Sequence, residues 1–175
     1  MHYLQWSDAL ETVATEWSSY CNFNHRSGTS SCSNALSALS SVDIDEYSSG
    51  DGCGENLYGS GADPTWSYVI GTSDYGIKGG IEDSWCVGEA ASWSYGTSIG
   101  SAGHYTQVVW ADTKYVGCGF YNCDSANGWM NNMFTCKYVE ALPLSLYIIV
   151  HSPLHSLSLY FHDLCVVQLL SSWQL

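Results

Sequence analysis

The stretch of the chain that points most clearly to chemistry is residues 103–110, which read GHYTQVVW. It places the imidazole of His104 directly before a run in which polar and apolar side chains alternate, the pattern of a half-buried strand. An imidazole at this position can ligate a metal ion, exchange a proton near neutral pH, or hydrogen-bond a neighbouring segment. The sequence therefore predicts a site at His104.

Nucleophilic catalysis is the weaker interpretation of this site. Ser101 and Thr106 lie close to His104 in the sequence, but neither lies in the glycine-flanked turn of a nucleophile elbow. On a strand, Thr106 would also point away from the face of Tyr105 and Gln107. We therefore expect binding rather than catalysis at His104, with an enzyme as the alternative.

The charge of the chain excludes one class of partner. Its 175 residues suffice for one domain with a core of its own. Seventeen carboxylates outnumber the cationic side chains Arg26, Lys78, Lys114 and Lys137, and the net charge is −13. Such a surface repels a phosphate backbone and an anionic bilayer alike. We expect no nucleic-acid partner.

Eight cysteines indicate a disulfide-bonded protein of an oxidising compartment. They lie at positions 21, 32, 53, 86, 118, 123, 136 and 165, without the CxxC pairs of a zinc ribbon. The first residues, MHYLQW, lack the basic, apolar and cleavage regions of a secretory signal. Because the cysteines predict secretion and these residues do not, we expect a truncated or mis-assigned start.

Two helices are predicted from apolar residues at three- and four-residue steps. The first begins after Ser7, a suitable N-cap, and carries Leu10 and Trp17 on one face. The second covers about residues 81–93, although a glycine within it lowers its helix propensity. A short helix is also predicted at residues 34–39, within a loop-rich region.

Three β-rich runs predict an antiparallel sheet; they are residues 105–110, 115–123 and 129–139. Asn127-Gly128, between the last two runs, is typical of a two-residue hairpin turn. A turn centred on Asn127 sets Cys118 opposite Cys136, with apolar neighbours on the same face of each strand. This arrangement predicts a buried cross-strand disulfide between them.

The character of the chain changes after residue 140. Residues 141–175 carry one charge, that of Asp163, and many leucines and serines. Their apolar runs fall short of the roughly 18 to 20 residues of a membrane span. A glycolipid-anchor signal or a poor membrane helix are alternatives, but we favour a segment foreign to the domain.

Several segments resemble those of the CAP superfamily, also called the SCP domain, which comprises cysteine-rich secretory proteins, antigen 5 and pathogenesis-related 1 proteins. They are residues 103–110, residues 54–58 (GENLY), residues 116–119 with Cys123, residues 136–138, and upstream residues 6–10 and 21–25. The resemblance covers about residues 4–139, so we assign a CAP domain to residues 1–140 and an unrelated tail to 141–175. It implies an α+β fold, an α-β-α sandwich around a central antiparallel sheet. The first helix of the family is expected before Trp6 and is absent from this sequence.

The resemblance also implies a tetrad of two histidines and two glutamates, which falls on His25, Glu55, Glu89 and His104. The family usually places the second glutamate three residues after a tryptophan, whereas four separate it from Trp85 here. A one-residue insertion, or use of Glu82 instead, would explain this spacing.

Two uses of the tetrad are compatible with its residue types. His25 and His104 could ligate a divalent cation such as zinc, with the glutamates orienting water or the imidazole rings. In the alternative, His104 and Glu55 hydrogen-bond each other and nearby backbone, and hold the sheet to a loop.

The resemblance further implies the disulfides Cys118–Cys136 and Cys21–Cys123, and leaves open the pairing of Cys32, Cys53, Cys86 and Cys165. It implies a secreted, monomeric binding module for sterols, fatty acids or other lipids, or for an extracellular protein or cell-wall component in defence or host interaction. Aromatic side chains could line a lipid groove or pack in the core; they are Tyr58, Trp66, Tyr68, Tyr75, Trp93 and Tyr95. A metal-dependent hydrolase with Glu55 or Glu89 as general base, and a structural cell-wall interaction protein, are the alternatives.

Overall fold

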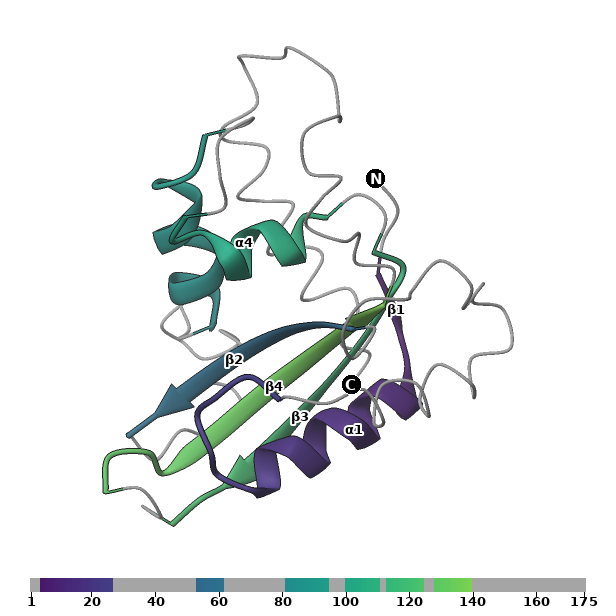
Figure 1. The fold of residues 1–175 in the computed structure, drawn as a ribbon, viewed down its shortest axis with the longest axis vertical. Coiled ribbons are helices and arrows are strands. Elements are labelled where there is room, and N and C mark those ends of the chain that lie inside the picture. The colour runs from purple at the N-terminus through teal and green to yellow at the C-terminus, as the bar shows by residue number, and fades with distance from the viewer. Residues whose placement is uncertain are drawn as a thin grey trace, which may run out of the picture.

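A four-stranded sheet forms the centre of the protein. The computed structural model describes residues 4–26, 53–61, 81–94, 100–110, 113–124 and 128–139 (Figure 1). The strands are β1 (Gln5–Trp6), β2 (Gly54–Ser60), β3 (Tyr115–Asn122) and β4 (Asn132–Val139), in the order β1-β3-β4-β2. The three long strands are antiparallel, as predicted, whereas the two-residue β1 runs parallel to β3.

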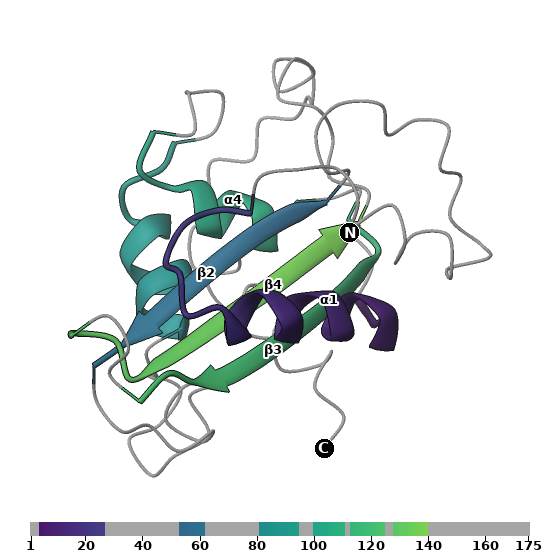
Figure 2. The same ribbon diagram turned by 60° about the horizontal axis from the view of Figure 1, so that its bottom comes forward.

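Helix α1 (Asp8–Ser19) covers one face of this sheet, across β3 and β4 (Figure 2). Ser7 is its N-cap, as predicted, because the side-chain oxygen of Ser7 accepts the backbone N–H of Leu10 at 3.3 Å. The helix ends where Cys21 takes a left-handed backbone conformation with φ of 52°. Its fully buried Leu10 alone contributes roughly 1.5 to 3 kcal/mol of hydrophobic stabilisation.

The absence of a side chain at Gly117 allows α1 to lie directly on the sheet. A Cβ atom at this position of β3 would collide with the backbone of α1 at Leu10 and Glu11. Gly117 pairs with Lys137 of β4, and Lys137 pairs with Glu55 of β2, so the three residues form one row across the sheet. The helix therefore covers the middle of this row.

The other face of the sheet packs against two short helices, η2 (Glu82–Gly88) and α4 (Gly103–Val108). Trp85 of η2, together with Tyr105 and Val108 of α4, forms a core with the apolar side chains of β3 and β4 on this face. With α1 on the opposite face, the predicted α-β-α sandwich is confirmed (Figures 1 and 2). No helix within the described residues is long and apolar enough to cross a membrane.

The hairpin prediction is confirmed by the strand register. Cys118 lies opposite Cys136 in the β3–β4 ladder, and the two cysteines form a disulfide on the buried face. A second disulfide joins Cys21, after α1, to Cys123, after β3, as the family resemblance implied. Asn127 lies outside the described residues, and Gly128 has the positive φ of 75° typical of such turns.

Cys53 and Cys86 are also disulfide-bonded, whereas Cys32 and Cys165 lie outside the described residues. The same holds for the helix predicted at residues 34–39 and for the tail at 141–175. The domain boundary at residue 140 therefore stays a prediction.

The prediction of a strand at residues 105–110 is wrong, because most of this segment forms helix α4. Tyr105 and Val108 are three residues apart and share the buried face of one helical turn. In addition, Glu89 accepts the backbone N–H of Tyr105, a donor that the first turn of a helix cannot satisfy internally. Tertiary packing thus overrides the β propensity of the threonine and valines. Strand β2 was not predicted.

Candidate cation site of two histidine–glutamate pairs

The first pair joins the loop after α1 to strand β2. His25 Nδ1 lies 2.8 Å from Glu55 Oε1, and the backbone N–H of Arg26 donates to the same oxygen at 3.1 Å. The other oxygen, Oε2, receives no aligned hydrogen bond from the described residues, but lies 2.7 Å from the ammonium of Lys137. This contact is an ion pair. Both oxygens of Glu55 are therefore engaged.

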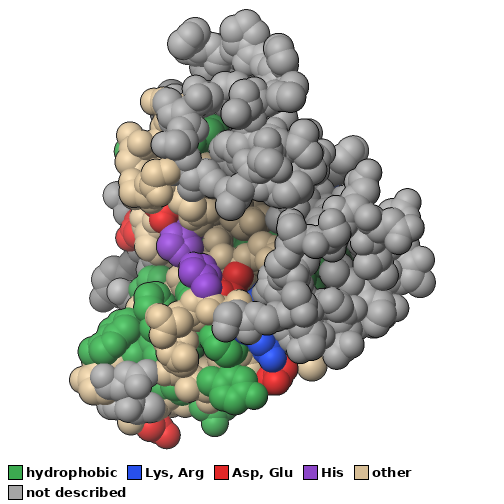
Figure 3. Space-filling view, in the orientation of Figure 1, with side chains coloured by type: hydrophobic (Ala, Val, Ile, Leu, Met, Phe, Trp, Pro, Cys, Tyr) green, Lys and Arg blue, Asp and Glu red, His purple; other side chains and the backbone are tan. Residues whose placement is uncertain are grey.

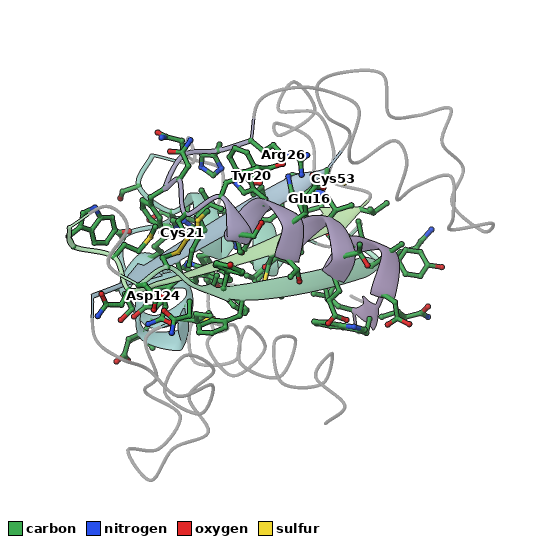
Figure 4. The ribbon with its side chains drawn as sticks, turned by 90° about the horizontal axis from the view of Figure 1, so that it is seen from below. Glu16, Tyr20, Cys21, Arg26, Cys53 and Asp124 are labelled. Atoms are coloured by element: carbon green, nitrogen blue, oxygen red, sulfur yellow. A yellow bond between two sulfur atoms is a disulfide. The ribbon has the colours of Figure 1, made fainter. Side chains whose placement is uncertain are left out.

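The loop that carries His25 is anchored at both ends. At its start, Cys21 is bonded to Cys123. At its end, the guanidinium of Arg26 lies 5.4 Å from the ring centre of Trp17 and 3.4 Å from the carboxylate of Glu16, both on α1 (Figure 4). Trp17 also donates its indole N–H to the backbone oxygen of Asn24, next to His25.

The second pair joins α4 to η2. His104 Nδ1 lies 2.5 Å from Glu89 Oε1, and Oε2 of the same carboxylate accepts the backbone N–H of Tyr105 at 2.9 Å. The ring of His104 also stacks on Trp85, with planes within 2° and centres 5.6 Å apart. Trp85 and Glu89 thus hold one imidazole by its face and its edge.

The four-residue spacing of Trp85 and Glu89 fits this arrangement because η2 is a π-helix, which has more residues per turn than an α-helix. Both side chains therefore reach His104 despite the extra residue between them. The side chain of Glu82, the alternative acid, lies outside the described residues.

Asn56 connects the two pairs. It follows Glu55 in β2, and its side-chain amide donates to the backbone oxygen of His104 at 3.1 Å and to the hydroxyl of Tyr138 at 3.3 Å. Burial raises the pKa of Tyr138, and the hydrogen bond from Asn56 partly opposes this rise. Burial also raises the pKa of Tyr105 to about 12. The neutral hydroxyls of Tyr105 and Tyr138 thus lie on the buried side of the site.

The histidines are exposed and the glutamates lie behind them. The side chains of His25 and His104 are 70% and 34% exposed, whereas those of Glu55 and Glu89 are 7% and 15% exposed. Figure 3 shows the histidine side chains of the described residues gathered on one face of the molecule, with acidic side chains next to them. His104 contacts Glu89 and His25 contacts Glu55, so the structure pairs His104 with a different glutamate from the one in the structural alternative.

The donor set fits a cation held by imidazole nitrogen. With each Nδ1 against a carboxylate, each ring keeps Nε2 for a metal ion, the arrangement typical of metal-ligating histidines. Among the described residues, no group of three or more His, Cys, Asp and Glu side chains is arranged to hold a metal ion. Protein ligands from this part of the chain would therefore be the two histidines.

The fold and this geometry agree with the comparison to known families. The model of CAP, the cysteine-rich secretory protein family, matches residues 1–138. The chain belongs to the CAP family. The resemblance seen in its motifs is therefore confirmed.

Three curated relatives show the extent of the similarity. Venom allergen 5 of Vespa velutina is 30% identical over 144 residues, which are 81% of this chain and 58% of the relative. Cysteine-rich secretory protein 2 of Homo sapiens is 28% identical over 142 residues, 79% of this chain and 46% of the relative. Salivary antigen-5 of Triatoma infestans is 28% identical over 150 residues, 79% of this chain and 50% of the relative. The chain spans about half the length of the curated relatives it matches.

Among solved structures, one entitled "Structure of BmVAL-1" matches with a TM-score of 0.48 and 20% sequence identity. The match covers 86% of this chain and 66% of the other.

Two of the aromatic side chains named from the sequence fit the core-packing alternative rather than a lipid groove. Tyr58 and Trp93 are half-buried and pack against the core, while Trp66, Tyr68, Tyr75 and Tyr95 lie outside the described residues. Sequence reasoning instead missed a group of exposed aromatic residues near the Cys21–Cys123 disulfide. These tip aromatics are Tyr20, Phe23, Tyr121 and Trp129.

The tip aromatics come from the end of α1, the loop after it, the end of β3 and the β3–β4 hairpin. Phe23 and Trp129 meet edge to face with ring centres 5.5 Å apart, over Gly59 of β2. Phe23 is 42% exposed and Trp129 is 53% exposed. Figure 4 shows Cys21 and Asp124 at one end of the molecule. No motif in the sequence marks these residues, because each comes from a different element.

Proposed function

We propose that this CAP-family chain is a secreted binding module that holds a divalent cation, with zinc as the best fit, on His25 and His104. The observation that carries the proposal is the pair of carboxylate–histidine contacts, at 2.8 Å for His25 and 2.5 Å for His104. Each contact fixes one ring nitrogen and leaves Nε2 for the metal ion. Imidazole nitrogen is a common ligand of Zn²⁺ in proteins. Secretion is supported by the disulfide-bonded state of all six described cysteines.

A cation held by two imidazoles is incompletely coordinated. Structural zinc sites close four positions with protein ligands. Here two positions would be left for water or for an oxygen or nitrogen atom of a bound partner. Such a site favours recognition of another molecule over a purely structural role.

The hydrolase alternative is weakened by the hydrogen bonds of the two glutamates. A general base must reach the proton it abstracts. Glu55 is engaged by His25, Arg26 and Lys137. Glu89 is engaged by His104 and by the N–H of Tyr105. Each oxygen of the two carboxylates already has a partner in the protein, which makes either glutamate a poorer general base.

The tip aromatics support the partner-binding part of the proposal. Exposed phenylalanine, tyrosine and tryptophan side chains supply apolar area together with polar groups, and are enriched at binding surfaces. They suit a sterol, a fatty acid or another lipid, or an extracellular protein or cell-wall component. Because the net charge is −13, an anionic bilayer or a nucleic acid is a poor candidate.

Calorimetric titration of the oxidised full chain with Zn²⁺ tests the cation site. We expect one tightly bound ion per chain, and its loss in both His25→Ala and His104→Ala. Binding that survives in both variants would reject the site.

Titration with a fluorescent sterol and a fluorescent fatty acid tests the ligand class. Saturable binding that is weakened in Phe23→Ala/Trp129→Ala would support a lipid-binding module that uses the tip aromatics. Absence of binding by the folded wild-type chain would reject the lipid classes and favour an extracellular protein or cell-wall partner.

A further inference from the structure

We propose that Lys137 is a positioning residue that fixes the tautomer and direction of the His25 ring through Glu55. The inference rests on the proposed cation site for its functional consequence, but the tautomer can be measured without any metal. Lys137 lies in β4 with a fully buried side chain that faces Glu55, so it is not itself proposed as a ligand.

The first observation is the burial of this lysine. Its side chain is fully buried, although an uncompensated ammonium is costly to remove from water. The cost is tolerated because Glu55 Oε2 lies 2.7 Å away on the neighbouring strand β2. On the other side of Lys137 the row ends at Gly117, where α1 lies directly on the sheet. The ion pair is therefore closed off from solvent by the helix.

The second observation is the hydrogen-bonding capacity of the groups around Glu55. An ammonium and a backbone N–H can donate but cannot accept. One faces Oε2 and the other faces Oε1, so both oxygens of Glu55 meet donors. The ammonium of Lys137 thus holds Oε2 of the carboxylate on the sheet side, and this leaves Oε1 facing His25.

The tautomer of His25 follows from this arrangement. Its Nδ1 lies 2.8 Å from an oxygen of the carboxylate, which when ionised can only accept, so Nδ1 carries the hydrogen. In the neutral ring the lone pair then resides on Nε2, on the exposed side. Lys137 thereby presets the ring for a cation before any cation arrives.

The second histidine provides an internal control. Glu89 is held by the backbone N–H of Tyr105, and no lysine or arginine of the described residues pairs with it. The ring of His104 is further fixed by stacking on Trp85. Removing the charge of Lys137 should therefore alter His25 and leave His104 unchanged.

The test is ¹⁵N NMR of the histidine rings in the full oxidised chain without metal, followed by Zn²⁺ titration. It compares the wild type with Lys137→Met, which keeps an unbranched side chain, one atom shorter, and removes its charge. Thr135→Val is the matched control. Thr135 is buried on the same face of β4 and bonds the hydroxyl of Ser18 at 2.9 Å, away from Glu55.

We expect wild-type His25 to be in the Nδ1–H form and Lys137→Met to lose this preference, with Zn²⁺ affinity about tenfold lower. His104 should keep its signals in both variants, and Thr135→Val should keep both tautomers and the affinity. An Nε2–H tautomer of His25 in the wild type would overturn the proposal. So would a folded Lys137→Met variant with unchanged His25 tautomer.

If Lys137→Met does not fold, the double variant Glu55→Gln/Lys137→Met, which removes both charges, is measured in its place. Loss of the His25 tautomer preference in this double variant supports the role of the ion pair, and its full retention overturns it. Failure of the wild type to bind Zn²⁺ would reject the proposed cation site alone, because the tautomer result is obtained without metal.

Discussion

The side-chain amide of Asn56 donates to the backbone carbonyl of His104 across 3.1 Å. This contact ties strand β2, which carries Glu55, to helix α4, which carries His104. The two histidine–glutamate pairs come from four separate segments of the chain. Asn56 thus connects the two pairs by a hydrogen bond and contributes to the relative position of the two imidazoles.

Replacement of Asn56 by alanine is expected to lower the free energy of unfolding by about 1 to 3 kcal/mol. The variant leaves the oxygen of His104 and the buried hydroxyl of Tyr138 without this donor. Denaturant unfolding measures the change. The control is Asn131→Ala, which removes an exposed hydrogen bond from the side-chain amide to the backbone oxygen of Gly61. It should lower the free energy of unfolding by less. Equal losses in the two variants would argue against a special role for Asn56.

The two disulfides are expected to differ in their contribution to stability. Cys21 and Cys123 are 102 residues apart, whereas Cys118 and Cys136 are 18 apart. Loop-closure entropy predicts a loss of about 4 to 5 kcal/mol for Cys21→Ala/Cys123→Ala and roughly 3 kcal/mol for Cys118→Ala/Cys136→Ala. Thermal unfolding of the two variants shows which disulfide contributes more to stability. The reverse order would show that packing of the Cys118–Cys136 pair in the core outweighs chain entropy.

The β3–β4 hairpin could be predicted in detail for two reasons. Successive side chains of a strand point to opposite faces of the sheet, and a short turn fixes the register of the two strands. The N-cap of α1 was predictable for a similar local reason, since Ser7 directly precedes the apolar pattern. The prediction of a strand at residues 105–110 failed because most of this segment belongs to the six-residue helix α4. Contacts with η2 and with Glu89, which lie earlier in the sequence, stabilise this helix. Local propensity carries no information about such contacts.

Stability is expected to fall in alkaline solution because of Tyr105. Burial raises the pKa of Tyr105 from 10.0 to about 12. The unfolded chain therefore releases this proton before the folded protein does, and the free energy of unfolding decreases from about pH 10 to about pH 12. Below about pH 10 the contribution of Tyr105 is fully present.

Denaturant unfolding at about pH 9 and about pH 11 measures this decrease. Tyr105→Phe cannot ionise and should lose less stability than the wild type over the same interval. An equal loss in the variant would assign the alkaline transition to other groups, such as Tyr138, whose pKa is also raised by burial.

Gly117→Ala is expected to destabilise the protein by about 1 to 3 kcal/mol. A methyl group at this position meets the backbone of α1 at Leu10 and Glu11, so the helix must shift away from the sheet. Thr12→Ala, on the exposed side of α1, is the control and should change stability by less than about 0.5 kcal/mol. A neutral Gly117→Ala variant would mean that α1 can move without cost.

The four residues of the site could be predicted only through the family resemblance. Which side chain each of them contacts could not be predicted. Composition and spacing alone indicate His104, but not that its carboxylate is Glu89, since Trp85 and Glu89 meet the ring from another segment of the chain. Lys137 is the clearest omission. A lysine in a strand ordinarily faces solvent, and its burial here depends on α1 lying over Gly117. The tip aromatics were missed because they come from separate segments of the chain, and the contact between Phe23 and Trp129 forms only on folding.

The most direct test of the cation site is pulsed electron paramagnetic resonance of the oxidised full chain with one equivalent of Cu²⁺, which counts the imidazoles bound to the ion. If His25 and His104 present their Nε2 atoms to one cation, the wild type shows two coupled imidazoles, and this two-imidazole signal is absent from both His25→Ala and His104→Ala. A wild-type spectrum with a single imidazole, or one that neither substitution changes, would contradict a shared site.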